Sequence, residues 1–80
     1  MKINILAFGI ISEIFGSNSI NLLLPHNINI IGLKAILNQK YPALLQLKSY
    51  MVAVNREYAN GEALITENDE IAIIPPVSGG

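Results

Sequence analysis

The chain has 80 residues, of which 51% are hydrophobic and 14% charged, and its formal net charge is −1. This length allows a single domain with one core, and the composition excludes an intrinsically disordered chain. Five scattered basic residues argue against a nucleic-acid-binding surface, and the absence of cysteine excludes disulfides, thiolate zinc sites and a cysteine nucleophile. No apolar run approaches the about 20 residues that span a bilayer, and no signal-peptide core is present, so we expect a cytoplasmic protein without a membrane partner.

The first part of the chain predicts two strands joined by a helical turn. Residues 2–8 alternate between two faces, as a half-buried strand does. Residues 11–15 predict a short helical turn that Gly16 ends, and residues 19–24 alternate again until Pro25. The two strands are expected to form a hairpin.

The middle of the chain predicts one main helix. Asn29 is a favourable N-cap, and apolar residues recur three or four positions apart over residues 30–41 until Pro42 ends the pattern. Gly32 lowers the stability of this helix by up to about 1 kcal/mol relative to alanine, and no sequence feature explains it. Residues 43–47 predict a further short helical turn.

The last part of the chain predicts three more strands. They cover residues 51–54, the dipeptide Tyr58–Ala59 and residues 70–74, with turns at residues 55–57 and 60–61 and a polar loop at residues 66–69. The order strand, strand, helix, strand, short strand, strand predicts an α+β roll of the β-grasp (ubiquitin-like) type over residues 1–74. In such a roll a mixed sheet of four to five strands packs on one main helix, and the first and last strands commonly lie side by side.

The outer face of this sheet is predicted to carry an apolar patch. If the isoleucines of the first and last strands face the helix, Phe8 and Ile74 lie on the opposite face, and Tyr58 can join them. We interpret Phe8, Tyr58 and Ile74 as a partner-binding patch near the point where the chain leaves the sheet. The alternative is that these are isolated exposed apolar side chains, which are common and bind nothing.

The final six residues, Pro75-Pro76-Val77-Ser78-Gly79-Gly80, predict an extended tail over residues 75–80. Each proline fixes φ and removes a backbone donor, so strand pairing cannot continue, and glycines without Cβ atoms can pass through a narrow channel. Six extended residues reach about 20 Å, enough to place the carboxylate of Gly80 in another protein's active site. A frayed terminus without function, or a short artificial extension, is the alternative.

Other arrangements with chemical potential are absent from the sequence. His26 is the only histidine and is expected in a solvated loop after Pro25, so neither a histidine-rich metal site nor a His–Cys dyad can form. The spacing of the acidic residues near position 69 fits no calcium loop, and no glycine-rich phosphate-binding motif occurs. We therefore expect no metal and no cofactor bound by this chain, and the Gly80 carboxylate is its one unusual chemical group.

The chain resembles the ubiquitin-like sulfur-carrier proteins, and among them the family of molybdopterin synthase small subunits. The resemblance covers essentially the whole chain and is most specific over residues 71–80, where a hydrophobic strand is followed by Pro-Pro-Val-Ser-Gly-Gly. Residues 68–70 and 53–55, and Phe8 with the following Glu13 and Gly16, resemble other parts of the family's pattern. Ser12 stands where an arginine is frequent, so the resemblance does not carry over a charge contact at that position.

The resemblance implies a sulfur carrier that is not an enzyme by itself but the sulfur-donor subunit of molybdopterin synthase. An adenylating enzyme similar to ubiquitin E1 would use ATP and Mg²⁺ to activate the Gly80 carboxylate. A sulfur donor such as a cysteine desulfurase or rhodanese-type protein would then convert it to a thiocarboxylate. The tail, Pro75, Pro76, Val77, Ser78 and Gly79, would insert into the large subunit of a two-plus-two heterotetramer, where sulfur passes to cyclic pyranopterin monophosphate.

Three other functions remain open from the sequence. The related thiamine-pathway sulfur carriers share the fold and the Gly-Gly end, but generally lack Pro-Pro-Val-Ser before it. A ubiquitin-like modifier would be conjugated to lysines of other proteins, and an interaction module would carry an inert tail.

Overall fold

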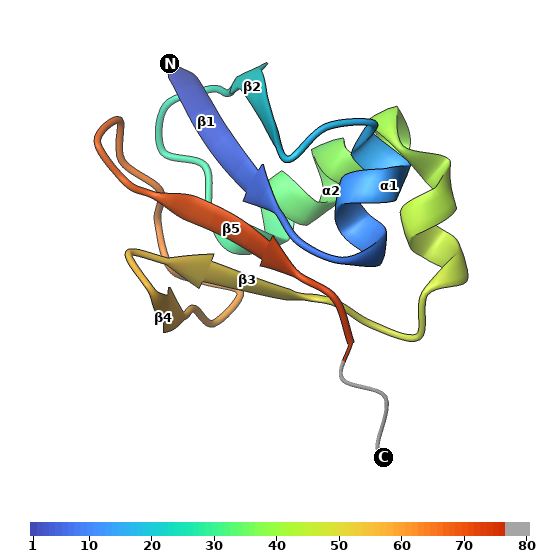
Figure 1. Cartoon of the computed structure of the whole chain (residues 1–80). Coiled ribbons are helices and arrows are strands. Elements are labelled where there is room, and N and C mark those ends of the chain that lie inside the picture. Colours follow the sequence, from blue (N-terminus) through green and yellow to red (C-terminus); the bar gives the residue numbers. More distant parts are fainter. Residues whose placement is uncertain (77–80) are drawn as a thin grey trace.

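The computed structural model describes residues 1–76, and its centre is a mixed five-stranded sheet with strand order β2-β1-β5-β3-β4 (Figure 1). In chain order the elements are β1 (Lys2–Ala7), α1 (Ile10–Phe15), β2 (Ser19–Leu23), α2 (Ile30–Lys40), the 3₁₀ helix η1 (Pro42–Gln46), β3 (Met51–Val54), β4 (Glu57–Tyr58) and β5 (Ile71–Ile74). β1 is antiparallel to β2 and parallel to β5, and β3 is antiparallel to both β5 and β4. The predicted β-grasp roll, with its first and last strands side by side, is confirmed.

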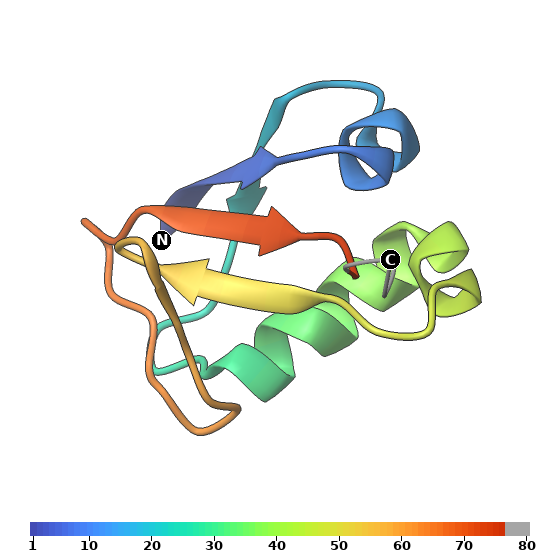
Figure 2. The ribbon, with the colours of Figure 1, turned by 60° about the horizontal axis from the view of Figure 1, so that its bottom comes forward.

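The helix α2 covers one face of this sheet, and the core lies between them (Figure 2). Residues that alternate along the two central strands face it, as predicted: Ile3, Ile5, Ile71 and Ile73 are each at most 1% exposed. Ile30, Leu33 and Leu37 face it from α2. Every buried side chain in the described part of the chain is hydrophobic. Apolar burial is therefore the main force that fixes the register of these strands.

The N-terminal end of α2 is closed by polar contacts from two segments. Asn29 is the N-cap, as predicted, and its Oδ1 accepts a hydrogen bond from the Gly32 N–H at 2.8 Å. The N–H groups of Ile30 and Ile31 donate to the carbonyl oxygens of Ala63 and Gly61, both at 3.1 Å. The loop before β5 therefore supplies acceptors for donors that a helix cannot satisfy itself.

The structure also explains Gly32. A Cβ atom at this position would lie 2.8 Å from Cγ1 of Ile28, which is a buried core residue. The missing side chain lets the segment before the helix fold back onto its first turn, and this packing offsets the lower helix propensity.

Several predicted boundaries are displaced by one residue. β1 ends at Ala7 rather than Phe8, and the fourth strand is Glu57–Tyr58 rather than Tyr58–Ala59. The second difference arises because Asn55 and Arg56 both adopt positive φ, 53° and 71°, in a tight two-residue turn.

Among residues 1–76, no helix is long and apolar enough to cross a membrane.

Candidate functional site at the root of the tail

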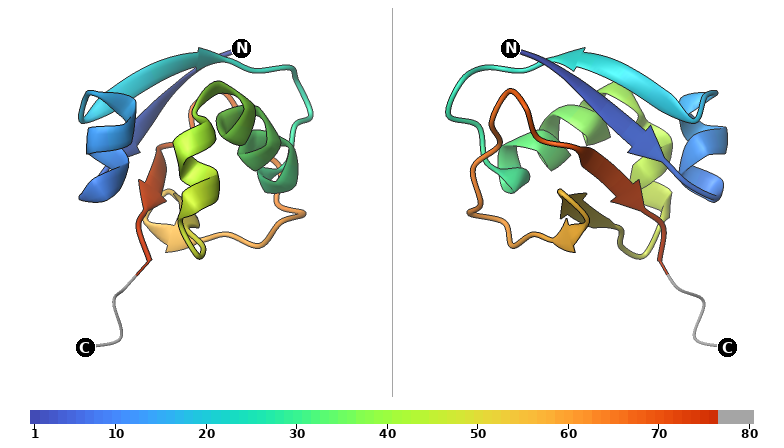
Figure 3. Two further views of the ribbon diagram at one scale, coloured as in Figure 1. Left: turned by 90° about the vertical axis from the view of Figure 1, so that its right-hand side faces the viewer. Right: turned by 60° about the vertical axis from the view of Figure 1, so that its left-hand side comes forward.

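The site begins at the end of β5, which is hydrogen-bonded to a strand on each side. β5 lies between β1 and β3, and both its inward-facing isoleucines have no exposed surface. Figure 3 shows the chain leaving the sheet at the end of this central strand, on the same side of the molecule as η1. Because β5 is paired with a strand on each side, the position of Ile74, where the chain leaves the sheet, is fixed.

Pro75, the first residue after β5, packs against the backbone of Gly9. A Cβ atom built on Gly9 would lie 3.2 Å from Cγ of Pro75, closer than ordinary van der Waals contact. Gly9 also has φ 54° and ψ −133°, a conformation that residues with side chains rarely adopt. The turn between β1 and α1 therefore forms the wall along which the chain leaves the sheet, and only glycine fits this wall without strain.

The beginning of β5 is held by a cluster of hydrogen bonds around Asn55. Its backbone N–H donates to the Glu70 carbonyl at 2.8 Å, its Oδ1 accepts from the Glu70 N–H at 2.9 Å, and its Nδ2 donates to Asp69 at 3.0 Å. The Asp69 carboxylate also accepts from the Thr66 N–H at 2.7 Å. Hydrogen bonds from the Thr66 backbone and the Asn55 side chain hold the pKa of Asp69 below its ordinary value.

The outer face of the sheet carries apolar side chains close to the tail root. Phe8 is 49% exposed and directly follows β1, whose last residue pairs with Ile73, so Phe8 lies beside Ile74. Ile74 is half-buried, and its register partner on β3 is Met51, which is 44% exposed. Phe8, just after β1, thus forms one row with Ile74 of β5 and Met51 of β3.

Tyr58 lies on the same face but outside this row. It pairs with Ala53, the residue of β3 that follows Met51 on this face. Its side chain is 65% exposed at the edge of the sheet. The structure therefore places the three predicted patch residues on one face, with Phe8 and Ile74 adjacent and Tyr58 at the periphery. That these residues bind a partner stays a prediction.

Sequence reasoning missed two residues of this region, Met51 and Gly9. Met51 could have been found from its alternation with the buried Val52, but its place beside Ile74 depends on the register of β3 against β5. The contact of Gly9 with Pro75 joins residues 66 positions apart and has no sequence signal.

A shallow hollow of about 410 Å³ adjoins Phe8 and extends the apolar surface towards α1. It is lined by Leu6, Ala7, Phe8, Gly9, Ser12 and Asn18. The Ser12 hydroxyl donates to the Gly9 carbonyl at 2.7 Å, so at this position a side chain closes the first turn of α1 instead of presenting a charge.

The structure describes only part of the predicted tail, and it also places the single histidine. His26 is exposed in the loop after β2, as expected. Within residues 1–76 there is no group of three or more histidine, aspartate or glutamate side chains that could hold a metal ion. Pro76 is half-buried, whereas Val77, Ser78, Gly79 and Gly80, with the predicted reactive carboxylate, lie outside the described residues.

Comparison with known sequences places this architecture in a family. The model of the ThiS family matches residues 5–80. A molybdopterin synthase sulfur carrier subunit from Arabidopsis thaliana is 35% identical, and the match covers all of this chain and 84% of the plant protein. A subunit of the same name from Dictyostelium discoideum is 40% identical, over 99% of this chain and 96% of its own length.

Solved structures give the same fold. A putative molybdopterin converting factor subunit 1 from Pyrococcus furiosus superposes with a TM-score of 0.86 at 16% identity, covering 96% of this chain and 99% of that chain. The complex of subunits 1 and 2 of molybdopterin-converting factor from Helicobacter pylori matches with a TM-score of 0.69 at 25% identity, over all of both chains. Small archaeal modifier protein 1 from Methanosarcina acetivorans matches with a TM-score of 0.76 at 26% identity, over 99% and 96% of the two chains.

The full-length matches at more than 30% identity and the shared β-grasp fold lead to one assignment. The chain belongs to the ThiS family and, within it, to the molybdopterin synthase sulfur carrier subunits.

Proposed function

We propose that this protein carries sulfur for the synthesis of molybdopterin, as the small subunit of a two-component molybdopterin synthase. The observation that carries the proposal is the match with sulfur carrier subunits along the whole chain, residues 77–80 included. The solved complex of the two subunits of the Helicobacter pylori factor supports a large subunit as the partner. The chain itself supplies the sulfur-bearing group, and the catalytic side chains belong to that partner.

In this proposal the reactive group is the carboxylate of Gly80. Its oxygen attacks the α-phosphorus of Mg²⁺-bound ATP on an E1-like activating enzyme, pyrophosphate leaves, and an acyl-adenylate forms. The terminal sulfur of a persulfide on a desulfurase or rhodanese-type donor then attacks the acyl carbon and displaces AMP. A thiol reduces the resulting acyl disulfide, so that a thiocarboxylate and a disulfide remain. The thiocarboxylate sulfur bonds to a carbon of cyclic pyranopterin monophosphate in the large subunit, and water then cleaves the acyl–sulfur bond and restores the Gly80 carboxylate. Two carriers serve each precursor in a two-plus-two assembly.

The described residues serve this chemistry by positioning the tail. β5 fixes where the chain leaves the sheet, and Pro75 against Gly9 fixes its direction. Pro75 and Pro76 donate no backbone hydrogen bonds, so neither can recruit a further strand to this end of β5. The apolar row of Phe8, Ile74 and Met51 offers a surface against which a partner can exclude water around the tail root.

The test is an intact-mass measurement on the full chain after incubation with its activating enzyme, ATP, Mg²⁺ and sulfide. Exchange of one carboxylate oxygen for sulfur adds about 16 Da, because the acyl-adenylate is attacked by sulfur instead of water. Matched control chains lack Gly80 or carry one extra residue after it, and neither is expected to gain this mass. Absence of the gain in the unmodified chain, with an activating enzyme proved on another carrier, contradicts the proposal.

The partner surface is tested separately through binding of the large subunit. Phe8→Asp places a charge in the apolar row, and we expect it to weaken binding by about tenfold or more. Leu23→Asp is the matched control. Leu23 ends β2 beside Lys2, is 82% exposed on the same sheet face, and lies at the opposite end of β1 from Phe8. Equal effects of the two substitutions would exclude a specific patch at the tail root.

A second candidate is conjugation to other proteins, favoured by the match with the Methanosarcina modifier protein. Conjugation and sulfur transfer share the adenylate, so the mass gain does not separate them. Covalent adducts of this chain with other proteins in cell extract, absent from the Gly80-deleted chain, would establish conjugation.

A further inference from the structure

The charges of this chain are segregated along the sequence and in space. Residues 14–55 contain no carboxylate side chain, and their only charged residues are Lys34, Lys40 and Lys48. Five of the six acidic residues, Glu57, Glu62, Glu67, Asp69 and Glu70, fall between positions 57 and 70.

The register of β3 against β5 separates Lys48 from the acidic residues of positions 57–70. Met51 pairs with Ile74 and Val54 pairs with Ile71, so the segment before β3 lies beside the end of β5, and the acidic loop leads into its beginning. The segment before β3, which carries Lys48, is therefore close to the tail root, whereas the five acidic residues of positions 57–70 lie at the other end of the two strands (Figure 1). The ion pair found among the described residues, Arg56 with Glu70 at 3.9 Å, belongs to the acidic end.

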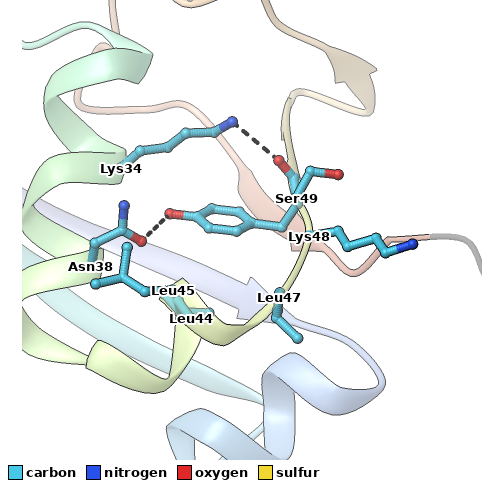
Figure 4. A pocket seen from close by; sticks show the side chains of 8 residues that line it. Lys34, Asn38, Leu44, Leu45, Leu47, Lys48 and Ser49 are labelled. Carbon is cyan, nitrogen blue, oxygen red and sulfur yellow. Dashed lines mark hydrogen bonds between the residues drawn. The ribbon is translucent and has the colours of Figure 1, made fainter.

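A groove of about 350 Å³ opens at the lysine-bearing end, between α2, η1 and the segment leading into β3 (Figure 4). We call it the basic groove, and it is lined by Lys34, Asn38, Leu44, Leu45, Leu47, Lys48, Ser49 and Tyr50. Tyr50 is buried and alternates with the exposed Met51, so the groove opens on the helix side of the sheet. The row of Phe8, Ile74 and Met51 lies on the opposite face of the sheet.

One wall of the basic groove is held in place by contacts within the chain. The Tyr50 hydroxyl donates to Asn38 Oδ1 at 2.8 Å, and Lys34 Nζ donates to the Tyr50 carbonyl at 3.1 Å. The same ammonium lies 5.0 Å from the centre of the Tyr50 ring. Burial raises the pKa of the Tyr50 phenol, so the hydroxyl remains a donor at neutral pH. This wall is therefore preformed, and its side chains lose little conformational freedom when a ligand binds.

The rest of the basic groove offers unused binding groups. Leu45 on η1 is 68% exposed and Leu47 is half-buried, so apolar surface of the groove is open to solvent. Lys48 is exposed, and Figure 4 shows its ammonium projecting outward, away from Lys34. No carboxylate among the described residues forms an ion pair with either lysine. Apolar side chains next to cations without counterions fit a ligand that has both leucine-like and carboxylate groups.

We propose that the basic groove is a second docking surface, for an acidic segment of a partner protein that carries apolar side chains between its carboxylates. The apolar side chains contact Leu45 and Leu47, and the carboxylates approach Lys48 and Lys34. The surface is separate from the row of Phe8, Ile74 and Met51 and goes beyond the proposed sulfur transfer. It allows a protein to hold this chain while the sheet face and the tail are engaged elsewhere.

The test titrates a capped heptapeptide of alternating glutamate and leucine into the isotope-labelled full chain and follows its backbone and side-chain amide NMR signals. We expect shifts at residues 44–50 and at the Asn38 side chain, with a dissociation constant of about 1 mM or below. The binding should weaken at about 0.5 M salt, because exposed charges are screened. Lys48→Gln is expected to weaken it by about two- to fivefold and Leu45→Ser by a similar factor. Lys2→Gln, a lysine change on the sheet face, is the matched control and should leave the affinity unchanged.

Four results would overturn the proposal. The first is an equal response to the same peptide with glutamine in place of glutamate, which would show that charge is irrelevant. Shifts confined to the row of Phe8, Ile74 and Met51 would place the peptide on the sheet face. The same shifts with inorganic phosphate alone would indicate a simple anion site, and the same shifts on concentrating the chain alone would identify a second copy as the occupant. None of these readouts depends on sulfur transfer, so the outcome is independent of the proposed function.

Discussion

The two ends of β5 are held by different kinds of interaction. At its beginning, Asn55, Thr66, Asp69 and Glu70 exchange directional hydrogen bonds between 2.7 and 3.1 Å. At its end, Pro75 contacts the bare backbone of Gly9. The polar end joins β5 to the turn after β3, whereas the other end releases the chain from the sheet and needs residues without donors. The comparison indicates that hydrogen bonds anchor the beginning of this strand to the turn after β3 and that steric contact fixes the direction in which the chain leaves its end.

The first prediction tests whether the middle of β5 contributes more than either end. Ile73→Ala removes a side chain with no exposed surface, and we expect a loss of about 3 kcal/mol in the free energy of unfolding. Ile74→Ala, one residue later on the half-buried face, is the matched control and should lose about 1 kcal/mol. Chemical denaturation measures both, and equal losses would contradict a one-sided core.

The second prediction breaks the polar end. Asn55→Ala removes two side-chain hydrogen bonds and places alanine at φ 53°, so we expect a loss of about 2 kcal/mol. Asn55→Gly keeps the backbone conformation accessible and should lose about 1 kcal/mol. Thermal or chemical unfolding of the pair separates hydrogen bonding from conformational strain. If the glycine variant were as destabilised as the alanine variant, the positive φ would contribute nothing to the loss of stability.

The third prediction breaks the apolar end. Gly9→Ala introduces both backbone strain and a contact at 3.2 Å with Pro75, and we expect a loss of about 1.5 kcal/mol. Gly16→Ala is the matched control, because Gly16 has φ 75° and nothing within 4 Å of its missing Cβ, and it should lose about 1 kcal/mol.

The contact itself is isolated by combining Gly9→Ala with Pro75→Ala. If Pro75 restricts the side chain at position 9, the double variant loses less stability than the sum of the two single variants. Strict additivity would show that Gly9 is required for its backbone conformation alone.

The smallest effect concerns pH at the polar end. The pKa of Asp69 is lowered in the folded state, so its contribution is fully present above the unfolded pKa of about 3.9 and is lost as the pH falls through the folded value. The contribution of this largely solvated group is expected to stay below about 1 kcal/mol. Denaturation between about pH 5 and pH 2 should show a shallower decline for Asp69→Asn than for the unmodified chain. Parallel curves would assign the acid sensitivity to other carboxylates.

The sequence alone predicted the helices and strands and the general position of the site. Alternation predicted the inward-facing isoleucines, the N-cap at Asn29 was predicted from local chemistry, and Pro75 marked where the sheet ends. These are local effects, because the period of an element and the chemistry of its ends are set by neighbouring residues. The position of Phe8 and Ile74 on the outer face followed from the same alternation.

Only the tertiary structure decided the features that depend on distant residues. Met51 joins the row beside Ile74 through the register of β3 with β5, and Gly9 meets Pro75 because β1 and β5 are parallel neighbours. The role of Gly32 depends on how Ile28 folds onto α2. Segregation of charge is visible in the sequence, but the groove beside two of the lysines exists because α2, η1 and the segment before β3 converge. Each of these contacts depends on the path of the whole chain, which the packing of one helix against one sheet determines.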